Sequence, residues 1–321
     1  MHLVTDPLVA AAALAQGHLA VLPTETVYGL GARADDPAAL ARVYATKGRP
    51  ADHPLIVHIA DLDALHAWSA DVPFYAARLA ERFWPGPLTL VLPRSIRALD
   101  AVTGGQDTVA LRISEHPMLR AVLDALARDT GDDAIGIAAP SANRFGGVSP
   151  TTAQHVVDEL GSLLQDGDVI LDGGACGVGV ESTIVDCTGD APVILRPGAV
   201  SANDVREVTG LDLGTRSDVR APGTLASHYA PAARVTIIAA ADASDVKPPA
   251  GLLALAGVPT PPGVVRLSAP ETVDDYARVL YAALREADAL HLPSVVAIAP
   301  SPEGIGAAVI DRLTRAARDS H

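Results

Sequence analysis

The chain is poor in cysteine, in aromatic residues and in positive charge. Its 321 residues include 2 cysteines, too few for a disulfide framework or a cysteine-based metal cluster, and this scarcity is typical of a reducing compartment. Aromatic residues make up 3% of the chain, so Ala, Val and Leu must form most of the core. The formal net charge of −14 argues against a general affinity for the nucleic-acid backbone but does not exclude a local basic pocket.

The sequence also lacks a long apolar run near its start. The apolar stretch Leu8–Leu14 is too short to cross a bilayer, and no basic segment precedes it. We therefore expect a cytoplasmic protein without a targeting signal or a membrane segment. The length of 321 residues and the hydrophobic fraction of 49% suit two folded domains with a substantial core.

Helix and strand patterns predict an α/β protein in three parts. Residues 1–207 form the first domain, residues 208–232 a linker with little periodicity, and residues 233–321 a smaller, Rossmann-like α/β domain with a largely parallel sheet. In the first domain we expect helices over 8–16, 37–45, 62–70, 73–83, 117–127 and 151–164, and strands over 18–22, 88–92, 108–113 and 168–172. In the second domain we expect strands over 235–239, 251–255, 264–267 and 295–299, and helices over 273–287 and 305–318.

The segment from Ile137 to Thr151 contains the most suggestive loop. An apolar run ends at Pro140, and the polar residues Ser141, Asn143 and Ser149 follow it. Loops after the strands of α/β proteins commonly hold the ligand. A polar surface turn between a strand and a helix would produce the same pattern, so this segment alone does not decide between the two interpretations.

Three positively charged residues stand out in this acidic chain: the pair Lys47 and Arg49, and Arg112. Lys47 and Arg49 flank a glycine directly before a strand that carries His58, and a glycine between two cations lets the backbone approach an anion. A solvated basic turn is the structural alternative. Arg112 lies within the apolar strand Thr108–Ile113, where a buried guanidinium needs an anionic partner. That partner is either an Asp or Glu of the protein or a carboxylate of the ligand.

Three further segments combine glycine or proline with polar groups. Pro23–Gly31 contains two Thr hydroxyls, a carboxylate and a phenol, and Gly173–Gly179 is glycine-rich but does not end in the Lys-Ser/Thr of a Walker loop. The linker carries His228 and Tyr229 between prolines, which is unusual for a passive spacer.

Taken together and in this order, these segments resemble the threonylcarbamoyl-AMP synthases, in the long form that joins a YrdC-like catalytic domain to a C-terminal domain. The matching stretches are Pro23–Gly31, Lys47–Pro50, His53–Ile59, Thr108–Ile113, Pro140–Thr151, Gly179–Asp186, Leu195–Gly198 and Pro222–Pro231. Two linker motifs, Pro222-Gly223 and His228-Tyr229-Ala230-Pro231, are the signature of the long form. The resemblance implies a twisted mixed sheet for the first domain, with a deep concavity lined by positive charge.

The resemblance also implies a reaction, in which L-threonine, bicarbonate and ATP give L-threonylcarbamoyladenylate and pyrophosphate. Such an enzyme is a nucleotidyltransferase, and Mg2+ accompanies the ATP phosphates rather than a protein cage. A separate tRNA threonylcarbamoyl transferase then passes the threonylcarbamoyl group to an adenosine of tRNA.

By the same resemblance, each segment receives a role. Lys47 and Arg49 would hold the phosphates as the catalytic pair. The threonine site would comprise Thr26, His58, Arg112, Ser182 and the backbone at Ala139. The ATP site would comprise Arg49, His53, Thr108, Ser141, Asn143, Ser149, Arg196 and Tyr229. His53 stands where the family usually has Asn, and Tyr229 would reach over the nucleotide as part of a lid.

Two other functions fit parts of the pattern. Hydrogenase-maturation carbamoyltransferases resemble the N-terminal domain only, and they carry zinc fingers that two cysteines cannot build. A non-catalytic RNA-binding or ribosome-maturation module would use the concavity as a cradle for RNA. The net charge of −14 and the lack of a Lys/Arg-rich stripe argue against that function, and no sequence feature supports direct tRNA binding.

Overall fold

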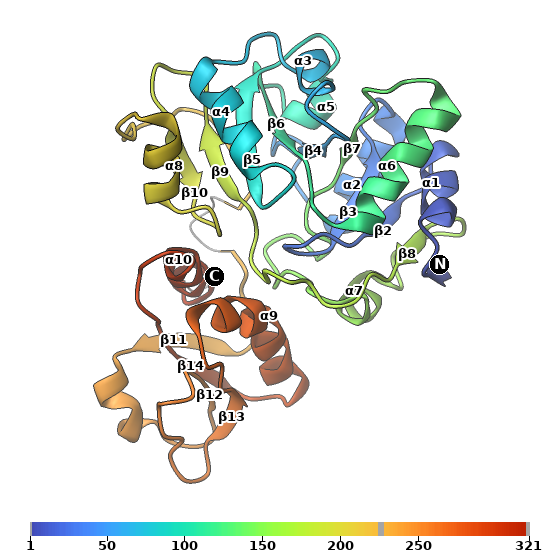
Figure 1. The fold of residues 1–321 in the computed structure, drawn as a ribbon. Coiled ribbons are helices and arrows are strands. Elements are labelled where there is room, and N and C mark those ends of the chain that lie inside the picture. The colour runs from blue at the N-terminus through green and yellow to red at the C-terminus, as the bar shows by residue number, and fades with distance from the viewer. Residues whose placement is uncertain (1, 224–227, 319–321) are drawn as a thin grey trace.

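The computed structural model describes residues 2–223 and 228–318. It contains a mixed sheet of ten strands and a separate parallel sheet of four, with helices packed on both (Figure 1). This arrangement confirms the predicted fold class of two α/β units. The predicted linker, residues 208–232, includes residues 224–227, which lie outside the described residues.

The strands of the large sheet come from the first 196 residues of the chain. They are β1 (His2–Val4), β2 (Ala20–Leu22), β3 (Gly29–Arg33), β4 (Ile56–His58), β5 (Leu88–Pro93), β6 (Thr108–Arg112), β7 (Ile137–Ala138), β8 (Val169–Leu171), β9 (Thr183–Asp186) and β10 (Val193–Arg196). Their spatial order is β1-β8-β2-β3-β7-β4-β6-β5-β9-β10. At the centre β4 and β6 are parallel, whereas β7 and β5 on either side of this pair run antiparallel to it.

The helices of this part of the chain cover the sheet (Figure 1). They are α1 (Pro7–Ala15), α2 (Pro37–Lys47), α3 (Leu65–Trp68), α4 (Phe74–Phe83), α5 (Asp100–Thr103), α6 (Pro117–Thr130), α7 (Ala153–Leu160) and α8 (Ala202–Thr209). The helices predicted over 62–70 and 151–164 are shorter than expected. No helix in the described ranges, 2–223 and 228–318, is long and apolar enough to cross a membrane.

Two helix ends explain how the chain reaches the pocket described below. The Asp36 carboxylate accepts hydrogen bonds from the amides of Ala38 and Ala39, and so caps the start of α2. The helix continues two residues past the predicted end, and Gly48, with φ of 64°, turns the chain in the left-handed conformation. Lys47 is therefore the last helical residue, and Arg49 already lies beyond the turn.

The helix α8 was missed in the sequence analysis, although it had a recognisable signal. The Ser201 hydroxyl accepts a hydrogen bond from the Asp204 amide, and the Asp204 carboxylate accepts one from the Ser201 amide, which completes a capping box. The helix packs on α4 and crosses the boundary predicted at residue 207.

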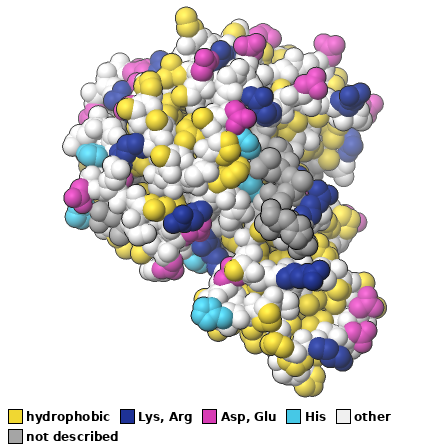
Figure 2. Space-filling model, turned by 180° about the vertical axis from the view of Figure 1, so that it is seen from behind, with side chains coloured by type: hydrophobic (Ala, Val, Ile, Leu, Met, Phe, Trp, Pro, Cys, Tyr) yellow, Lys and Arg dark blue, Asp and Glu magenta, His cyan; other side chains and the backbone are white. Residues whose placement is uncertain are grey.

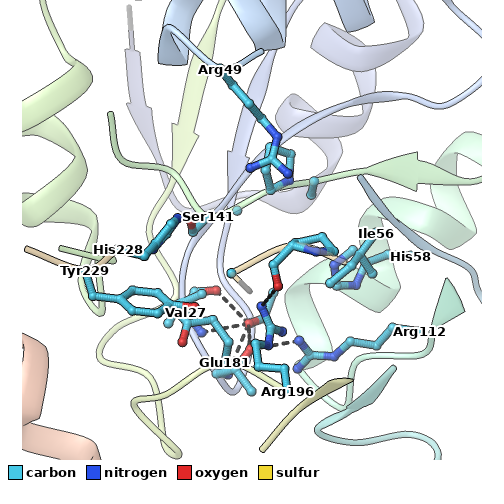
Figure 3. Close-up of a pocket in the computed structure, with 17 residues that line it drawn as sticks. Val27, Arg49, Ile56, His58, Arg112, Ser141, Glu181, Arg196, His228 and Tyr229 are labelled. Carbon is cyan, nitrogen blue, oxygen red and sulfur yellow. Dashed lines mark hydrogen bonds between the residues drawn. The ribbon is translucent and has the colours of Figure 1, made fainter. Parts of the chain in front are cut away.

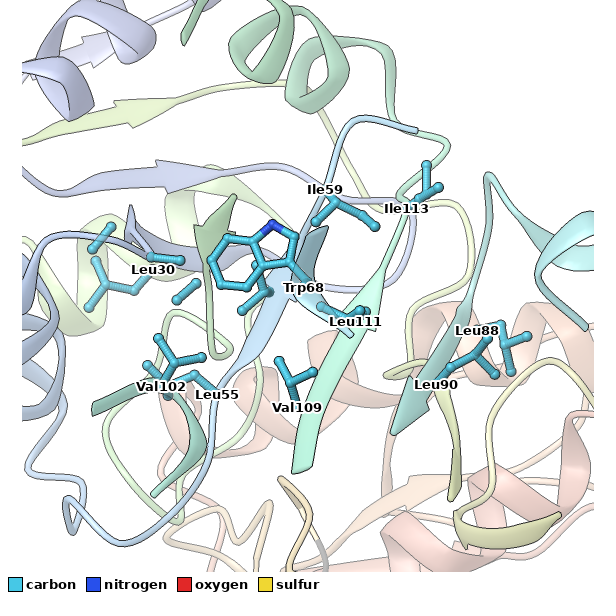
Figure 4. Close-up of a cluster of buried hydrophobic side chains, with 14 of the residues drawn as sticks. Leu30, Leu55, Ile59, Trp68, Leu88, Leu90, Val102, Val109, Leu111 and Ile113 are labelled. Carbon is cyan, nitrogen blue, oxygen red and sulfur yellow. The ribbon is translucent and has the colours of Figure 1, made fainter. Parts of the chain in front are cut away.

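Mostly aliphatic side chains fill the core, and Trp68 is its largest fully buried side chain. The Trp68 indole is fully buried among residues such as Leu30, Leu55 and Leu111 (Figure 4). Its Nε1 donates a hydrogen bond to the Ala134 carbonyl at 2.8 Å, so the polar atom is also satisfied. The scarcity of aromatic residues is thus accommodated by packing aliphatic side chains around Trp68.

The C-terminal unit has its own sheet, in the order β11-β14-β12-β13, with all neighbours parallel. Its elements are β11 (Arg234–Ile238), the 3-10 helix η1 (Ala240–Asp245), β12 (Gly251–Leu253), β13 (Val265–Ser268), α9 (Val273–Ala289), β14 (Ser294–Ile298) and α10 (Gly306–Ala316). The helices α9 and α10 lie between this sheet and the large domain (Figure 1). The small domain therefore meets the rest of the molecule through helix surfaces.

Candidate active site

A pocket opens where the large sheet meets the end of the linker (Figure 3). Its cavity volume is about 50 Å3, which is below the range typical of small-molecule sites. Segments far apart in the sequence line it: Thr24, Thr26, Val27, Gly29, Arg49, Ile56, His58, Arg112, Ala139, Pro140, Ser141, Glu181, Arg196, Pro222, Gly223, His228 and Tyr229.

Strand register brings the central lining residues together. The parallel pairing of β4 with β6 sets His58 opposite Arg112. Gly29 at the start of β3 forms a bridge with Ser141, and the Ala142 amide donates to the Tyr28 carbonyl at 2.7 Å. The loop that begins at Pro140 is therefore fixed to the sheet and forms one wall of the pocket.

Arg49 reaches the pocket with much of its donor capacity unused. Its Nη2 donates to the Pro54 carbonyl at 2.9 Å, and its guanidinium lies 5.7 Å from the centre of the Phe145 ring. Among the described residues, no acceptor lies within hydrogen-bonding reach of its buried Nε. Burial lowers the pKa of Arg49 to about 10, so the group stays charged at neutral pH.

Arg112 has the structural partner that the sequence analysis left open. Its Nη2 lies 2.6 Å from Glu25 Oε1, its Nη1 donates to Thr26 Oγ1 at 2.9 Å, and its Nε donates to the Gly86 carbonyl at 3.3 Å. Burial raises the pKa of Glu25, but Arg112 and the Ser114 hydroxyl more than offset this and hold it below its usual value. Arg112 is thus an ion-paired group that also lines the pocket.

Arg196 is held against the opposite wall by Ser182. Its Nε donates to the Ser182 carbonyl and its Nη2 to the Ser182 hydroxyl, both at 3.0 Å, while its Nη1 donates to the Pro222 carbonyl at 3.1 Å. Ser182 itself is not one of the described residues that line the pocket. It acts on the site by fixing the guanidinium of Arg196.

Lys47, a predicted phosphate contact, is held by backbone carbonyls of the loop after Pro140. Its Nζ donates to the Ser141 carbonyl at 2.5 Å and to the Asn143 carbonyl, and Lys47 is not among the described lining residues. Lys47 is the last residue of α2, whereas Arg49 lies past the turn at Gly48, so the two cations belong to different local structures. Burial and then the charge of Arg49 lower the pKa of Lys47 to about 7, while the Glu159 carboxylate opposes the shift.

Two other predicted ATP contacts are part of the loop's internal framework. The Asn143 Nδ2 donates to the carbonyls of Arg144 and Gly147, and the Ser149 hydroxyl donates to Glu181 Oε1 at 2.6 Å. Both Asn143 and Ser149 are buried and neither is a described lining residue, so they shape the loop rather than face its cavity.

His53 and Thr108 also lie outside the described pocket lining. The His53 ring meets the Phe145 ring edge-on, with centroids 5.3 Å apart. Thr108 starts β6 and pairs with Pro93 at the far end of the strand from Arg112. Their predicted roles came from motif position alone, and the sheet carries Thr108 away from the cavity.

Two buried imidazoles line the pocket, one from β4 and one from the linker. Burial lowers the pKa of His58 to about 3, with the charge of Arg112 contributing, and burial lowers the pKa of His228 to about 3 as well. Both rings are therefore neutral at neutral pH. Within the described chain, neither Nδ1 has a hydrogen-bond partner.

Tyr229 closes the pocket on the linker side. It is 1% exposed, its backbone has a left-handed φ of 63°, and its ring stacks on Tyr281 of α9 with centroids 5.7 Å apart. A non-glycine residue in this conformation is strained and needs surrounding contacts to hold it. The predicted position of Tyr229 over the cavity thus depends on a helix of the other domain.

The sequence analysis missed Glu181 and His228 as lining residues. His228 adjoins Tyr229 in a motif that was noticed, and Glu181 stands between a glycine-rich loop and a strand, where a functional carboxylate could have been suspected. Arg312, which contacts Glu181 from α10, had no signal because its partner lies 131 residues away.

The described residues contain no group of three or more His, Cys, Asp or Glu side chains arranged to hold a metal ion. Both Glu181 oxygens already accept hydrogen bonds, from Ser149, Tyr281 and Arg312. The donor set therefore suits a cation that arrives with phosphate ligands better than one held by the protein alone.

Comparisons with known proteins place both parts of the chain. Residues 12–198 match the family described as telomere recombination (Sua5_yciO_yrdC), and residues 200–318 match the C-terminal domain of threonylcarbamoyl-AMP synthase. The threonylcarbamoyl-AMP synthase of Pyrococcus abyssi is 38% identical over 96% of this chain and 93% of its own length. That of Bacillus subtilis is 38% identical over 97% of this chain and 93% of its own length.

A solved structure agrees with this assignment. The crystal structure of P. abyssi Sua5 complexed with L-threonine matches with a TM-score of 0.88 and 35% identity, covering 99% of this chain and 98% of that one. The chain therefore belongs to the threonylcarbamoyl-AMP synthase family, in the form that carries both domains.

Proposed function

We propose that this protein is an L-threonylcarbamoyladenylate synthase, which makes L-threonylcarbamoyladenylate and pyrophosphate from L-threonine, bicarbonate and ATP. One observation carries the proposal beyond family membership. Three guanidiniums, of Arg49, Arg112 and Arg196, converge on one pocket in a chain with a net charge of −14 (Figure 3). Such a pocket is suited to several anionic groups at once, which is what this reaction must bring together.

Threonine fits the part of the pocket around β3, β4 and β6. Arg112 and Thr26 lie at hydrogen-bonding distance from each other there, with His58 opposite Arg112 in the sheet. A neutral His58 can donate to or accept from an uncharged hydroxyl or amine without adding charge. We assign this end to L-threonine, with Ala139 contributing its backbone.

The nucleotide fits the part of the pocket nearer the linker. Arg49 offers unused donors, Ser141 lines the wall, and Arg196 faces the cavity beside Tyr229. We assign the phosphates to the two arginines and the cover over the nucleotide to Tyr229. Mg2+ would be held by the phosphates and water and would neutralise charge on them.

In this arrangement the protein positions reactants and neutralises charge. The threonine amine first attacks the carbon of bicarbonate; a C–N bond forms, a C–O bond breaks and water leaves, which gives N-carboxythreonine. The carboxylate oxygen of this N-carboxy group then attacks the α-phosphate of ATP. A new O–P bond forms as the bond to pyrophosphate breaks, and the electron pair leaves with the pyrophosphate. No enzyme nucleophile is needed, so Ser141 contributes to position rather than to a covalent intermediate. Tyr229 and His228 exclude water, which would hydrolyse the mixed anhydride.

The product must be passed to a second enzyme. A mixed anhydride of this kind calls for an acceptor enzyme, and we propose a tRNA threonylcarbamoyl transferase in the cytoplasm. On the face shown in Figure 2, Lys and Arg side chains are scattered among acidic ones rather than gathered in a stripe. That face supports release of the intermediate to a partner enzyme better than direct binding of tRNA.

The decisive test is pyrophosphate release from ATP by the purified protein with Mg2+. We expect release that requires both L-threonine and bicarbonate, with each omission lowering the rate to background. Release that is equal without threonine would contradict the proposal. Binding of tRNA without any pyrophosphate release would instead favour a non-catalytic RNA-binding module.

A further inference from the structure

A carboxylate lies among the guanidiniums of the pocket. Glu181 is 5% exposed and lines the cavity on the side of Arg196 and Tyr229. Because like charges repel strongly where water is scarce, an uncompensated carboxylate at this place would oppose a bound polyanion. Something must therefore neutralise Glu181.

The neutralising group comes from the C-terminal domain. Arg312 of α10 donates from Nε to Glu181 Oε2 at 2.8 Å, and Tyr281 of α9 donates its hydroxyl to the same oxygen at 2.8 Å. The large domain contributes the Ser149 hydroxyl to the other oxygen at 2.6 Å. Burial alone would raise the pKa of Glu181, but Arg312 and then Arg196 lower it to about 2.

The same two residues also hold the linker tyrosine. The Arg312 guanidinium lies 5.2 Å from the centre of the Tyr229 ring, and the Tyr281 ring stacks on it at an interplanar angle of 28°. Arg312 is 1% exposed, and its remaining donors reach Asp311 and the Pro197 carbonyl. Its position is thus fixed from several sides at once.

Arg312 and Tyr281 do not themselves line the pocket. All described lining residues lie between Thr24 and Tyr229, so the C-terminal domain acts on the site only through residues of the other parts. The two domains also meet away from the pocket, where Arg285 of α9 forms an ion pair with Glu159 at 2.5 Å. That second pair provides an internal comparison for the first.

We propose that Arg312 is a positioning residue for the nucleotide end of the site: it neutralises Glu181 and so leaves Arg196 available to phosphate. The proposal rests on the function proposed above, because it takes ATP as the polyanion. If Arg312 is removed, the Glu181 carboxylate keeps Arg196 as its nearest cation and competes with the nucleotide for it. The defect should therefore appear in ATP binding more than in threonine binding.

The test compares Arg312→Met, Glu181→Gln and the double variant with the wild type in the pyrophosphate assay. For Arg312→Met we expect the KM for ATP to rise at least about tenfold, with the KM for threonine within about twofold, because a buried charge loses its partner. In the double variant the uncompensated carboxylate is gone, so most of the ATP affinity should return. Arg285→Met, which breaks the other interdomain ion pair, should leave both KM values within about twofold.

Three results would overturn the proposal. They are an unchanged KM for ATP in Arg312→Met, an equal rise of both KM values, and the same defect in Arg285→Met. If Arg312→Met alone does not fold, the test compares Glu181→Gln with the double variant. The KM for ATP should be similar in these two proteins, and a large rise in the double variant would contradict the proposal.

Calorimetry with ATP and Mg2+ separates this proposal from the proposed function. If the wild type binds ATP but releases no pyrophosphate with threonine and bicarbonate, the reaction is wrong, and the same variants still report on Arg312 through their ATP affinities. If the wild type is active and Arg312→Met binds ATP equally well, only the role of Arg312 is wrong.

Discussion

The two domains contribute to one site in different ways. The large sheet and the linker supply every described lining residue, and strand register sets the positions of His58 and Arg112. The small sheet supplies none, but the helices that cover it place Tyr281 and Arg312 against Glu181 and Tyr229. The large domain and the linker thus supply the residues that can contact ligand, and the small domain supplies residues that hold some of them in place.

The difference follows from which surface each domain presents. The centre of the large sheet ends in loops, such as the one from Pro140, whose polar groups can face a cavity. The small domain presents the sides of α9 and α10. Packed side chains of these helices cross the interface and contact residues of the large domain. A residue on such a helix is well placed to orient a neighbour but is shielded from ligand.

The largest effect should come from removing a contact residue of the large domain. Arg49→Ala deletes a guanidinium that lines the pocket and has spare donors, so we expect kcat/KM to fall at least about 100-fold. Pyrophosphate release under saturating threonine and bicarbonate measures this. Arg33→Ala, which removes a partly exposed ion pair with Asp35, is the matched control and should change kcat/KM less than about twofold. Wild-type rates in Arg49→Ala would end its assignment as a phosphate contact.

A smaller effect on activity is expected from a change at Lys47. This change tests whether the large domain also contains residues that hold the site in place without contacting ligand. Lys47→Met removes the donor to the Ser141 and Asn143 carbonyls. The Ser141 carbonyl still accepts from the Asn143 amide, whereas an unsatisfied Asn143 carbonyl costs about 1–3 kcal/mol. We expect a lower free energy of unfolding in urea and about a tenfold fall in kcat as the loop loses its position. Lys247→Met, at the chain's other and exposed lysine, should show neither change.

The opposite pattern at Lys47 would restore the original prediction. If the KM for ATP rises sharply while the free energy of unfolding is unchanged, the ammonium contacts phosphate when the nucleotide is bound. The comparison would then place Lys47 with the contact residues rather than with the supporting ones.

Much of the fold and part of the site could be predicted from the sequence, because their signals are local. The alternation of predicted strands with predicted helices indicated the α/β class, which the structure confirms. Arg49, Arg112 and Tyr229 stood out because each is unusual in its own segment. All three line the pocket.

The rest depended on distant partners that no local pattern encodes. The sequence did not reveal that Lys47 would donate to the Ser141 and Asn143 carbonyls, which lie 94 and 96 residues away in the chain. It did not link Glu181 to Arg312 or Arg112 to Glu25, because those pairs form only when the sheet and both domains are assembled. Motif position was therefore a better guide to the region of the site than to which side chains face it.

The smallest effect should come from the interface itself, at the glycine-rich loop. A Cβ at Gly179 would lie 2.6 Å from the Ala277 carbonyl and would meet the backbone of Arg278 on α9, whereas one at Gly174 would meet nothing within 4 Å. Both glycines have a left-handed φ, of 85° and 80°, so the alanine variants share a backbone penalty of about 1 kcal/mol.

The difference between these variants isolates the contact with the small domain. We expect Gly179→Ala to destabilise the protein by about 1–2 kcal/mol more than Gly174→Ala in urea unfolding, since α9 must move to admit the new methyl group. Because α9 carries Tyr281, the shift should also raise the KM for ATP a few-fold in Gly179→Ala alone. If both variants keep wild-type KM values while differing in stability, the docking of α9 stabilises the molecule without supporting the site. The division between contact and support would then rest on α10 and Arg312.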